Sequence, residues 1–242
     1  MAGHSKWKNI QHRKGRQDAA RAQKFTKVSK EIYAAAKNGG GNPDTNPQLK
    51  AAIQKARAIS MPQDNIERTI KKALGEIGGA RYELIVYEGY GPGGVAYLIE
   101  ALTDNRNRTA AKIRHLFQKY GGSLGESGSA NYIFEPKAAF VLDGGADWAD
   151  EETLLTLLIE HGGEEMETTD GETILYAPQE AYAPLLQALT DAGYTITRQE
   201  LVQLPTVFVP VSGEVLEQNE ALLAAFEEED DVQEVYTNFE PA

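Results

Sequence analysis

The sequence predicts an α+β protein: an N-terminal three-helix domain followed by two α/β sandwich domains, the last ferredoxin-like (βαββαβ) and inserted into the middle one. Three observations predict this. Apolar residues recur at helical spacing up to about residue 75, strand-like alternation begins near residue 81, and the order β-α-β-β-α-β is complete within 138–201. The expected domains are residues 1–80, residues 81–136 together with 205–242, and residues 137–204.

The first domain is expected to contain three short amphipathic helices. One begins after a cap at Asp18 and runs to about Lys37, the second begins at Asn46-Pro47, and the third begins at Pro62. Each helix carries a single apolar stripe, so the three should pack together as a small bundle. The stripes are Phe25, Val28, Ile32, Ala35 and Ala36; Leu49, Ile53, Ala56 and Ile59; and Ile66, Ile70 and Leu74.

The middle domain should begin with a hairpin whose strands are 83–88 and 95–102. Its glycine-rich turn lacks the Lys-Ser/Thr pair of a phosphate-binding loop, so it is interpreted as a hairpin turn. A helix is expected from Arg106 to about Tyr120, and a strand at 131–135.

The inserted domain should begin with a strand at 138–142 and end with a strand at 194–203. After it, the tail offers a strand at 206–211, a helix at 214–229 and a strand at 232–239. Two strands and one helix are too few for a separate core. We therefore expect the tail to complete the middle domain.

Charge divides the chain sharply. Residues 1–80 carry 16 Lys and Arg against 6 Asp and Glu, a net charge of +10, whereas residues 81–242 carry 8 against 30, a net charge of −22. A basic end on an acidic protein is typical of a segment that holds a polyanion, although a merely solvated lysine-rich helical surface has the same composition. Nucleic acid is the partner that this pattern favours.

The most basic segment surrounds Trp7, whose indole either stacks on an exposed base or anchors the arm against the helices that follow. Arg68, Lys71 and Lys72 share one outward face of the third helix, and the start of the helix at Arg106 is either a weaker anion contact or an ordinary solvated helix face. The candidate nucleic-acid-binding residues are Lys6, Trp7, Lys8, His12, Arg13, Lys14, Arg16, Arg21, Lys24, Lys27, Lys30, Arg68, Lys71, Lys72, Arg106 and Arg108.

The sequence offers no set of catalytic residues. It has no cysteine, no HExxH motif and no nucleophile elbow, so no enzyme, no cofactor and no small-molecule substrate are predicted. His161 among glutamates is interpreted as a helix-end residue and not as a metal ligand, and the acidic run 227–231 as a solvated surface. Without a secretion signal or a membrane-spanning run, a cytoplasmic protein is expected.

Five blocks of the sequence resemble the YebC/PmpR family, which includes the mitochondrial translational activator of cytochrome oxidase subunit I. The blocks are GHSKWKNIQHRKGRQDAARAQKFTK, NPQLKAAIQKA, MPQDNIERTIKKA, YEGYGPGGVAYLIEALTDNRNRT and GGSLGESGSANYIFE, in this order within residues 2–135. The resemblance implies a helical domain followed by two α/β domains around an open cleft. It also implies a non-enzymatic regulator, named in the family as a probable DNA-binding transcriptional regulator.

Family members also act at the ribosome as translation factors that assist elongation through proline runs, which gives the alternative of a ribosomal RNA ligand. Within residues 1–80, Lys outnumbers Arg by 11 to 5, a composition suited to phosphate contacts more than to base reading. The sequence therefore favours weak base specificity and leaves DNA and ribosomal RNA both open. A protein-binding adaptor is the third possibility.

Overall fold

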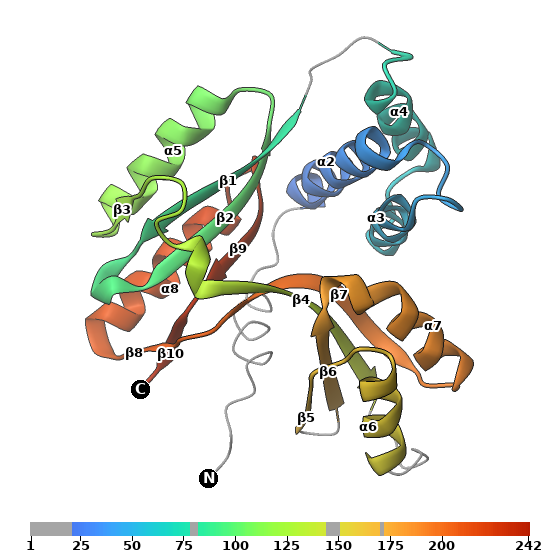
Figure 1. Cartoon of the computed structure of the whole chain (residues 1–242). Coiled ribbons are helices and arrows are strands. Elements are labelled where there is room, and N and C mark those ends of the chain that lie inside the picture. The colour runs from blue at the N-terminus through green and yellow to red at the C-terminus, as the bar shows by residue number, and fades with distance from the viewer. Residues whose placement is uncertain (1–20, 78–81, 144–150, 170–171) are drawn as a thin grey trace. The chain divides into compact units, whose positions relative to one another are not determined.

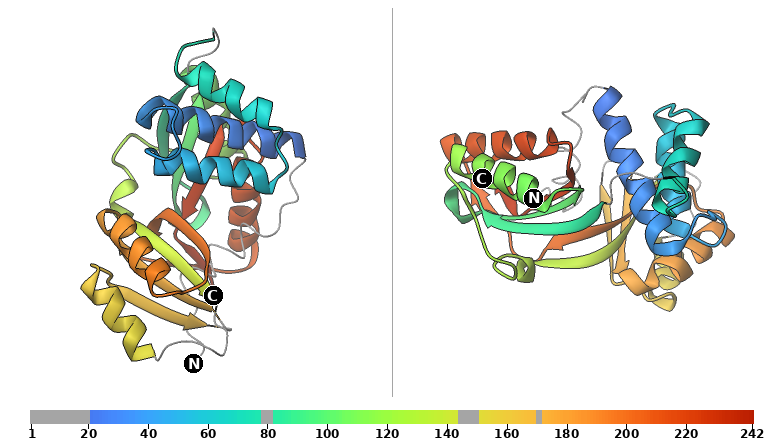
Figure 2. Two further views of the ribbon diagram at one scale, coloured as in Figure 1. Left: turned by 90° about the vertical axis from the view of Figure 1, so that its right-hand side faces the viewer. Right: turned by 90° about the horizontal axis from the view of Figure 1, so that it is seen from above.

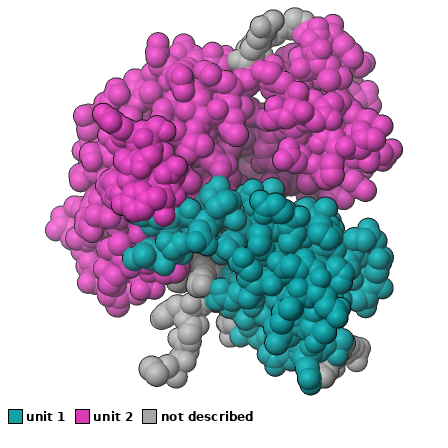
Figure 3. Space-filling model, viewed as in Figure 1, with its two compact units in different colours: residues 1–15, 133–207 teal, residues 16–132, 208–242 magenta. Residues whose placement is uncertain are grey.

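A computed structural model describes residues 21–77, 82–143, 151–169 and 172–242 (Figure 1). These residues fall into two compact units (Figure 3): one contains residues 133–207, and the other contains the described residues up to 132 together with 208–242. The mixed fold, with N-terminal helices followed by sheets, is the class that the sequence predicts. The finer division of the chain into three domains stays a prediction, and the expected cap Asp18 lies outside the described residues.

Helices α2 (Arg21–Gly39), α3 (Pro47–Ala58) and α4 (Gln63–Ala73) form a small bundle (Figure 2). Each helix contributes a large, fully buried aliphatic side chain to the core, namely Ile32, Leu49 and Ile66. Leu74, which was expected to face inward, is 45% exposed. The reason is that α4 ends at Ala73, which leaves Leu74 as the cap residue beyond the apolar stripe.

Asn46 joins the end of α2 to the start of α3. Its side-chain oxygen accepts a hydrogen bond from the Leu49 N–H at 3.1 Å, the geometry of a helix cap. Its amide nitrogen donates to the carbonyl oxygens of Ala35 and Gly40 at 2.8 Å each. One buried side chain therefore satisfies backbone groups at both helix ends, and it fixes the turn between the helices.

The larger unit also contains a four-stranded antiparallel sheet in the order β3-β1-β2-β9. Helices α5 and α8 lie side by side on one face of it (Figure 2), and between helices and sheet the rings of Tyr97, Phe117 and Phe226 meet with centroids 4.9–5.9 Å apart. Strands β1 and β2 and helix α5 precede the smaller unit in the sequence, whereas α8 and β9 follow it. This core therefore combines segments from both sides of the smaller unit. The elements are β1 (Glu83–Tyr90), β2 (Ala96–Thr103), α5 (Arg106–Lys119), β3 (Ser123–Leu124), α8 (Gly213–Glu227) and β9 (Val232–Thr237).

The expected strand at 131–135 is wrong in its boundaries. Asn131–Ile133 form a turn of 3₁₀ helix, and β4 (Phe134–Asp143) then runs without a break through the segment expected as a separate strand at 138–142. Pro136 is tolerated because β4 is paired there with β7 alone, which makes the position equivalent to an edge strand. The strand belongs to the smaller unit.

The last expected strand is interrupted at Asn238. Residues before it form β9, and residues after it form β10 (Phe239–Pro241), which pairs in parallel with β8 (Val209–Val211). The Asn238 side-chain oxygen accepts the Ala96 N–H at 2.8 Å, and its carbonyl oxygen accepts the Val209 N–H at 2.8 Å. One asparagine therefore turns the chain from the large sheet to the small one.

The smaller unit is ferredoxin-like. Its antiparallel sheet has the order β5-β6-β4-β7, which is the arrangement that the βαββαβ motif forms. Buried Phe140, Leu158 and Leu185 belong to the strand β4 and to the two helices, so the helices cover the sheet through a common core. The remaining elements are α6 (Glu151–Glu160), β5 (Glu165–Thr169), β6 (Glu172–Pro178), α7 (Tyr182–Asp191) and β7 (Ile196–Pro205).

A buried carboxylate organises the loop that precedes β4. Glu88 is 4% exposed, and its two oxygens accept hydrogen bonds from the backbone N–H groups of Gly128, Ala130 and Asn131 at 2.7–2.8 Å. Gly128 has φ +89°, a left-handed conformation that favours glycine. Burial raises the pKa of Glu88, but the three donors outweigh it, so the pKa lies below its usual value of 4.5.

Glu88→Gln should lower the free energy of unfolding by about 1–3 kcal/mol, because an amide has one acceptor oxygen and turns an N–H₂ group toward backbone donors. The lowered pKa means that the contribution of Glu88 is complete above pH 4.5 and is lost as the pH falls through the folded-state pKa. Urea unfolding at pH 7 and at lower pH measures both effects. An unchanged stability at pH 7 would show that the loop does not depend on this carboxylate.

Excision of residues 137–204, with a short Gly-Ser linker, should leave the rest of the chain folded. The cut ends are close because Glu135 pairs with Leu204, and Phe134 with Pro205, across antiparallel strands. A chain that ends at residue 204 should instead lose the core formed by α8 and β9. Near-ultraviolet circular dichroism during heating checks both variants. Cooperative melting of the shorter chain, equal to that of the full protein, would contradict this prediction.

Candidate nucleic-acid interface

The predicted arm lies outside the described residues, and with it seven of the candidates: Lys6, Trp7, Lys8, His12, Arg13, Lys14 and Arg16. Arg21 is the first residue of α2. The other eight candidates belong to α2, α4 and α5, and the structure divides them into outward and inward cations.

Helix α4 carries the outward group. Arg68, Lys71 and Lys72 are all exposed, and none of their side chains has a hydrogen-bond or ion-pair partner within the described ranges. Two further exposed cations, Lys50 and Arg57, lie on α3; their side chains are unpaired among the described residues, and they are not among the predicted contacts. The sequence could have indicated both residues, because α3, like α4, has an apolar stripe and therefore a polar outer face.

Helix α2 carries the inward group. The Lys27 amino group donates to the carbonyl oxygen of Glu227, and burial lowers the pKa of Lys27. Lys30 is 6% exposed and donates to the carbonyl oxygen of Asp230 at 2.6 Å and to Oδ1 of Asp231 at 2.7 Å. Lys24 is half-buried and has an interaction partner. A phosphate could reach Lys30 only by displacing an internal carboxylate.

The acidic run 227–231 was expected to be solvated, and the structure corrects this. Besides the contacts to α2, Lys112 donates to Glu229 at 2.7 Å and Arg108 donates to Oδ2 of Asp231 at 3.0 Å. Four cations from α2 and α5 therefore contact one short acidic segment. The sequence could not reveal this, because the partners lie about 120 to 200 residues apart.

Asp231 is the centre of this cluster. Besides Lys30 and Arg108, the Thr109 hydroxyl donates to its Oδ2 at 2.8 Å, and its side chain is 7% exposed. Burial raises the pKa of Asp231, but hydrogen bonds from Lys30, Thr109 and Arg108 reverse the effect and lower the pKa to about 2. The carboxylate is thus held in its ionised form.

The weaker anion contact expected at the start of α5 is occupied by this carboxylate. Asn105 caps the helix by accepting the Arg108 N–H at 3.1 Å, and the Arg108 guanidinium bonds both Asp104 and Asp231, which raise the pKa of Arg108. Arg106 is exposed and has no ion-pair partner in the part of the chain that the structure describes. Of the two predicted residues of α5, Arg106 therefore presents a charge that is unpaired within the described residues, whereas Arg108 does not.

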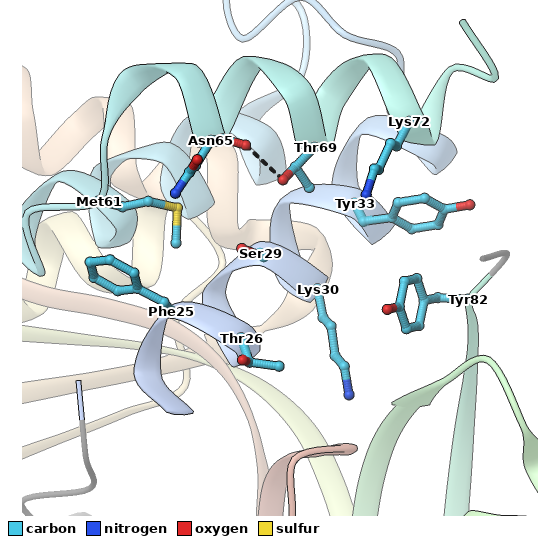
Figure 4. Close-up of a pocket in the computed structure, with 10 residues that line it drawn as sticks. All are labelled: Phe25, Thr26, Ser29, Lys30, Tyr33, Met61, Asn65, Thr69, Lys72 and Tyr82. Atoms are coloured by element: carbon cyan, nitrogen blue, oxygen red, sulfur yellow. Dashed lines mark hydrogen bonds between the residues drawn. The ribbon is translucent and has the colours of Figure 1, made fainter. Parts of the chain in front are cut away.

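A hollow of about 290 Å³ lies between α2 and α4, with Tyr82 at its border (Figure 4). Met61 lines one end, Ser29 and Asn65 line the middle, and Lys72 extends over the other end. The hollow thus joins an apolar end to a cationic one.

Among the described residues, no group of three or more His, Asp or Glu side chains could hold a metal ion. His161 lies at the end of α6, where its Nδ1 is 2.9 Å from the Leu157 carbonyl oxygen. In the same part of the chain, no helix is long and apolar enough to span a membrane.

Asp231→Asn should destabilise the protein by about 3–5 kcal/mol, because Lys30 would remain buried without its counter-charge. Asp230→Asn is the matched control, since Asp230 is exposed and offers Lys30 only its backbone carbonyl. Urea unfolding at pH 7 compares the two. Equal stabilities would contradict the role assigned to the Asp231 side chain.

The same group predicts a pH dependence. Because folding lowers the pKa of Asp231 from 3.8 to about 2, its contribution of about 2 kcal/mol is complete above pH 4 and is lost between about pH 4 and pH 2. The wild-type protein should therefore lose more stability over this interval than Asp231→Asn does. Parallel slopes of stability against pH for the two proteins would overturn the assignment.

Comparisons with known proteins agree with one another. Residues 5–76 match the family model of the TACO1/YebC protein N-terminal domain, and residues 82–239 match that of the TACO1/YebC second and third domain. A probable transcriptional regulatory protein of Geobacillus thermodenitrificans is 50% identical over 240 residues, covering 99% of this chain and 97% of the relative. Another of the same name, from Persephonella marina, is 48% identical over 243 residues, covering 99% and 96%.

A solved structure has the same fold. The crystal structure of a conserved hypothetical protein from Aquifex aeolicus superposes with a TM-score of 0.80 at 41% identity, covering 93% of this chain and 92% of that chain. The two family models together match most of the chain, and the sequence relatives match it nearly from end to end. The chain therefore belongs to the TACO1/YebC family.

Proposed function

We propose that the protein is a non-enzymatic, nucleic-acid-binding regulator of gene expression that acts in the cytoplasm. Its relatives are named probable transcriptional regulatory proteins, and control of transcription through DNA is the function that this name supports. The observation that carries the proposal is the outward basic surface of the bundle, formed by Lys50, Arg57, Arg68, Lys71 and Lys72. These five cations are exposed, and within the described ranges no carboxylate neutralises them.

The pairing of the inward cations reduces the number of residues that we propose to contact nucleic acid. Lys30 and Arg108 belong to the Asp231 cluster, so we assign them to the stability of the unit and not to the ligand. The proposed surface consists of the α3 and α4 cations, Arg106, and the basic arm around Trp7. Neutralising phosphates with these groups would release counterions, which is the main source of affinity in non-specific binding.

Ribosomal RNA is the alternative ligand. Lys is more frequent than Arg in residues 1–80, and a lysine ammonium contacts phosphate as a point charge without the planar fork that reads guanine. A surface of this kind holds a backbone of either nucleic acid. Titration of the protein with a DNA duplex and with a structured ribosomal RNA fragment, at one salt concentration, compares the two ligands.

The double variant Arg68→Gln/Lys71→Gln should weaken binding and flatten its salt dependence. Each phosphate contact contributes about 0.9 to the slope of log affinity against log salt on duplex DNA, so the slope should fall by about 2. Fluorescence anisotropy with a labelled duplex between 50 and 200 mM salt, values that bracket the physiological range, measures it.

Arg114→Gln is the control for this measurement, because Arg114 is an exposed cation of α5 outside the proposed surface and without a partner in the described chain. Its slope should equal that of the wild type. If the double variant and the control bind alike, the α4 cations are a solvated surface and the proposed interface is wrong.

A further inference from the structure

We propose that the hollow between α2 and α4 binds one unpaired nucleotide, with the base toward Met61 and the phosphate at Lys72. The proposal rests on the proposed function, since it names the part of a nucleic acid that this bundle would hold. At about 290 Å³, the hollow is just below the range for small-molecule sites, roughly 300–1,000 Å³. That space suits one nucleotide and excludes a duplex.

The chemistry along the hollow follows the order of groups in a nucleotide. At one end the half-buried ring of Phe25 and the largely buried side chain of Met61 give the hollow an apolar lining for a base. The Ser29 hydroxyl and the Asn65 amide border the middle (Figure 4), and neither has a side-chain hydrogen bond to another described residue. Such groups can donate to and accept from the edge of a base. Lys72 is likewise exposed and unpaired, so its ammonium is available to a phosphate.

The electrostatic surroundings place the phosphate at Lys72. Lys30 also borders the hollow, but its charge is paired with Asp231. A phosphate at Lys30 would have to displace the Asp231 carboxylate, whereas at Lys72 it meets a cation that has no partner among the described residues.

The walls of the hollow are held in place before any ligand binds. The rings of Tyr33 and Tyr82 meet edge to face with centroids 5.2 Å apart, and the Lys30 ammonium lies 5.7 Å from the centre of the Tyr82 ring. On α4, the Thr69 hydroxyl donates to the Asn65 carbonyl oxygen at 2.8 Å (Figure 4). A ligand would therefore not have to order these side chains, which lowers the free-energy cost of binding.

Methionine methyl resonances test the proposal in the full-length protein. The chain has three methionines, at positions 1, 61 and 166, so ¹³C-methyl labelling gives a probe in the hollow (Met61) and one in the other unit (Met166). Titration with the four ribonucleoside 5′-monophosphates should shift the Met61 signal saturably and leave Met166 unchanged. Nucleosides without phosphate should bind about tenfold more weakly, because they lack the charge-assisted contact to Lys72.

Two charge-removing variants separate the site from general charge. Lys72→Gln should weaken mononucleotide binding about tenfold, whereas Arg114→Gln removes a positive charge from α5, outside both the lining of the hollow and the proposed surface, and should change it less than about twofold. Equal effects of the two variants, or a Met61 signal that none of the nucleotides moves, would overturn the proposal. The hollow would then be left to another class of ligand, such as a peptide.

Titration with two nucleic-acid polymers distinguishes a failure of the nucleotide site from a failure of the proposed function on which it rests. An RNA hairpin with an unpaired loop should shift Met61, and a blunt duplex should bind without shifting it. Binding of both polymers with an unmoved Met61 would overturn the nucleotide site and leave the proposed function standing. A Met61 shift by mononucleotides, together with no binding of either polymer, would support the site and overturn the proposed function.

Discussion

The buried carboxylate of Asp231 is the contact on which the larger unit depends. It receives donors from α2 through Lys30 and from α5 through Arg108 and Thr109, while the residue itself stands just before β9. A buried charge is tolerated only when donors surround it, and removing one partner leaves another charge unsatisfied. The helical bundle, the start of α5 and the edge of the sheet are therefore fixed together by one group.

The positively charged side chains of the bundle therefore fall into two groups: one is paired inside the unit, and the other is exposed at its surface. Lysines of α2 lie against the acidic run 227–231, whereas the cations of α3 and α4 remain at the surface. A count of charge along the sequence adds the two kinds together and so overstates the surface that a polyanion can reach. The acidic run is likewise only in part a solvated surface, because several of its members serve as internal counter-ions.

Local signals carried most of the fold. Asn46 followed by Pro47 located a helix start, and the βαββαβ order located the ferredoxin-like sheet. The strand boundaries that were predicted wrongly, at 131–135 and at 232–239, are set by contacts between residues distant in sequence. The chain divides at Asn131–Ile133 because the preceding loop is bonded to Glu88, and the last strand stops at Asn238 because that side chain is bonded to Ala96. For the site, helical spacing grouped the α4 cations, but the burial of Lys30 depends on a residue 201 positions away and leaves no local pattern.

The long separation between Lys30 and Asp231 has a consequence for biosynthesis. The ribosome makes the bundle before the ferredoxin-like unit, and it releases the acidic run after both. Until then Lys27 and Lys30 lack the partners that they have in the finished protein, and the sheet β3-β1-β2 lacks its β9 edge. If the bundle folds as a unit when it is made, its α2 lysines are therefore uncompensated in the immediate neighbourhood of ribosomal RNA.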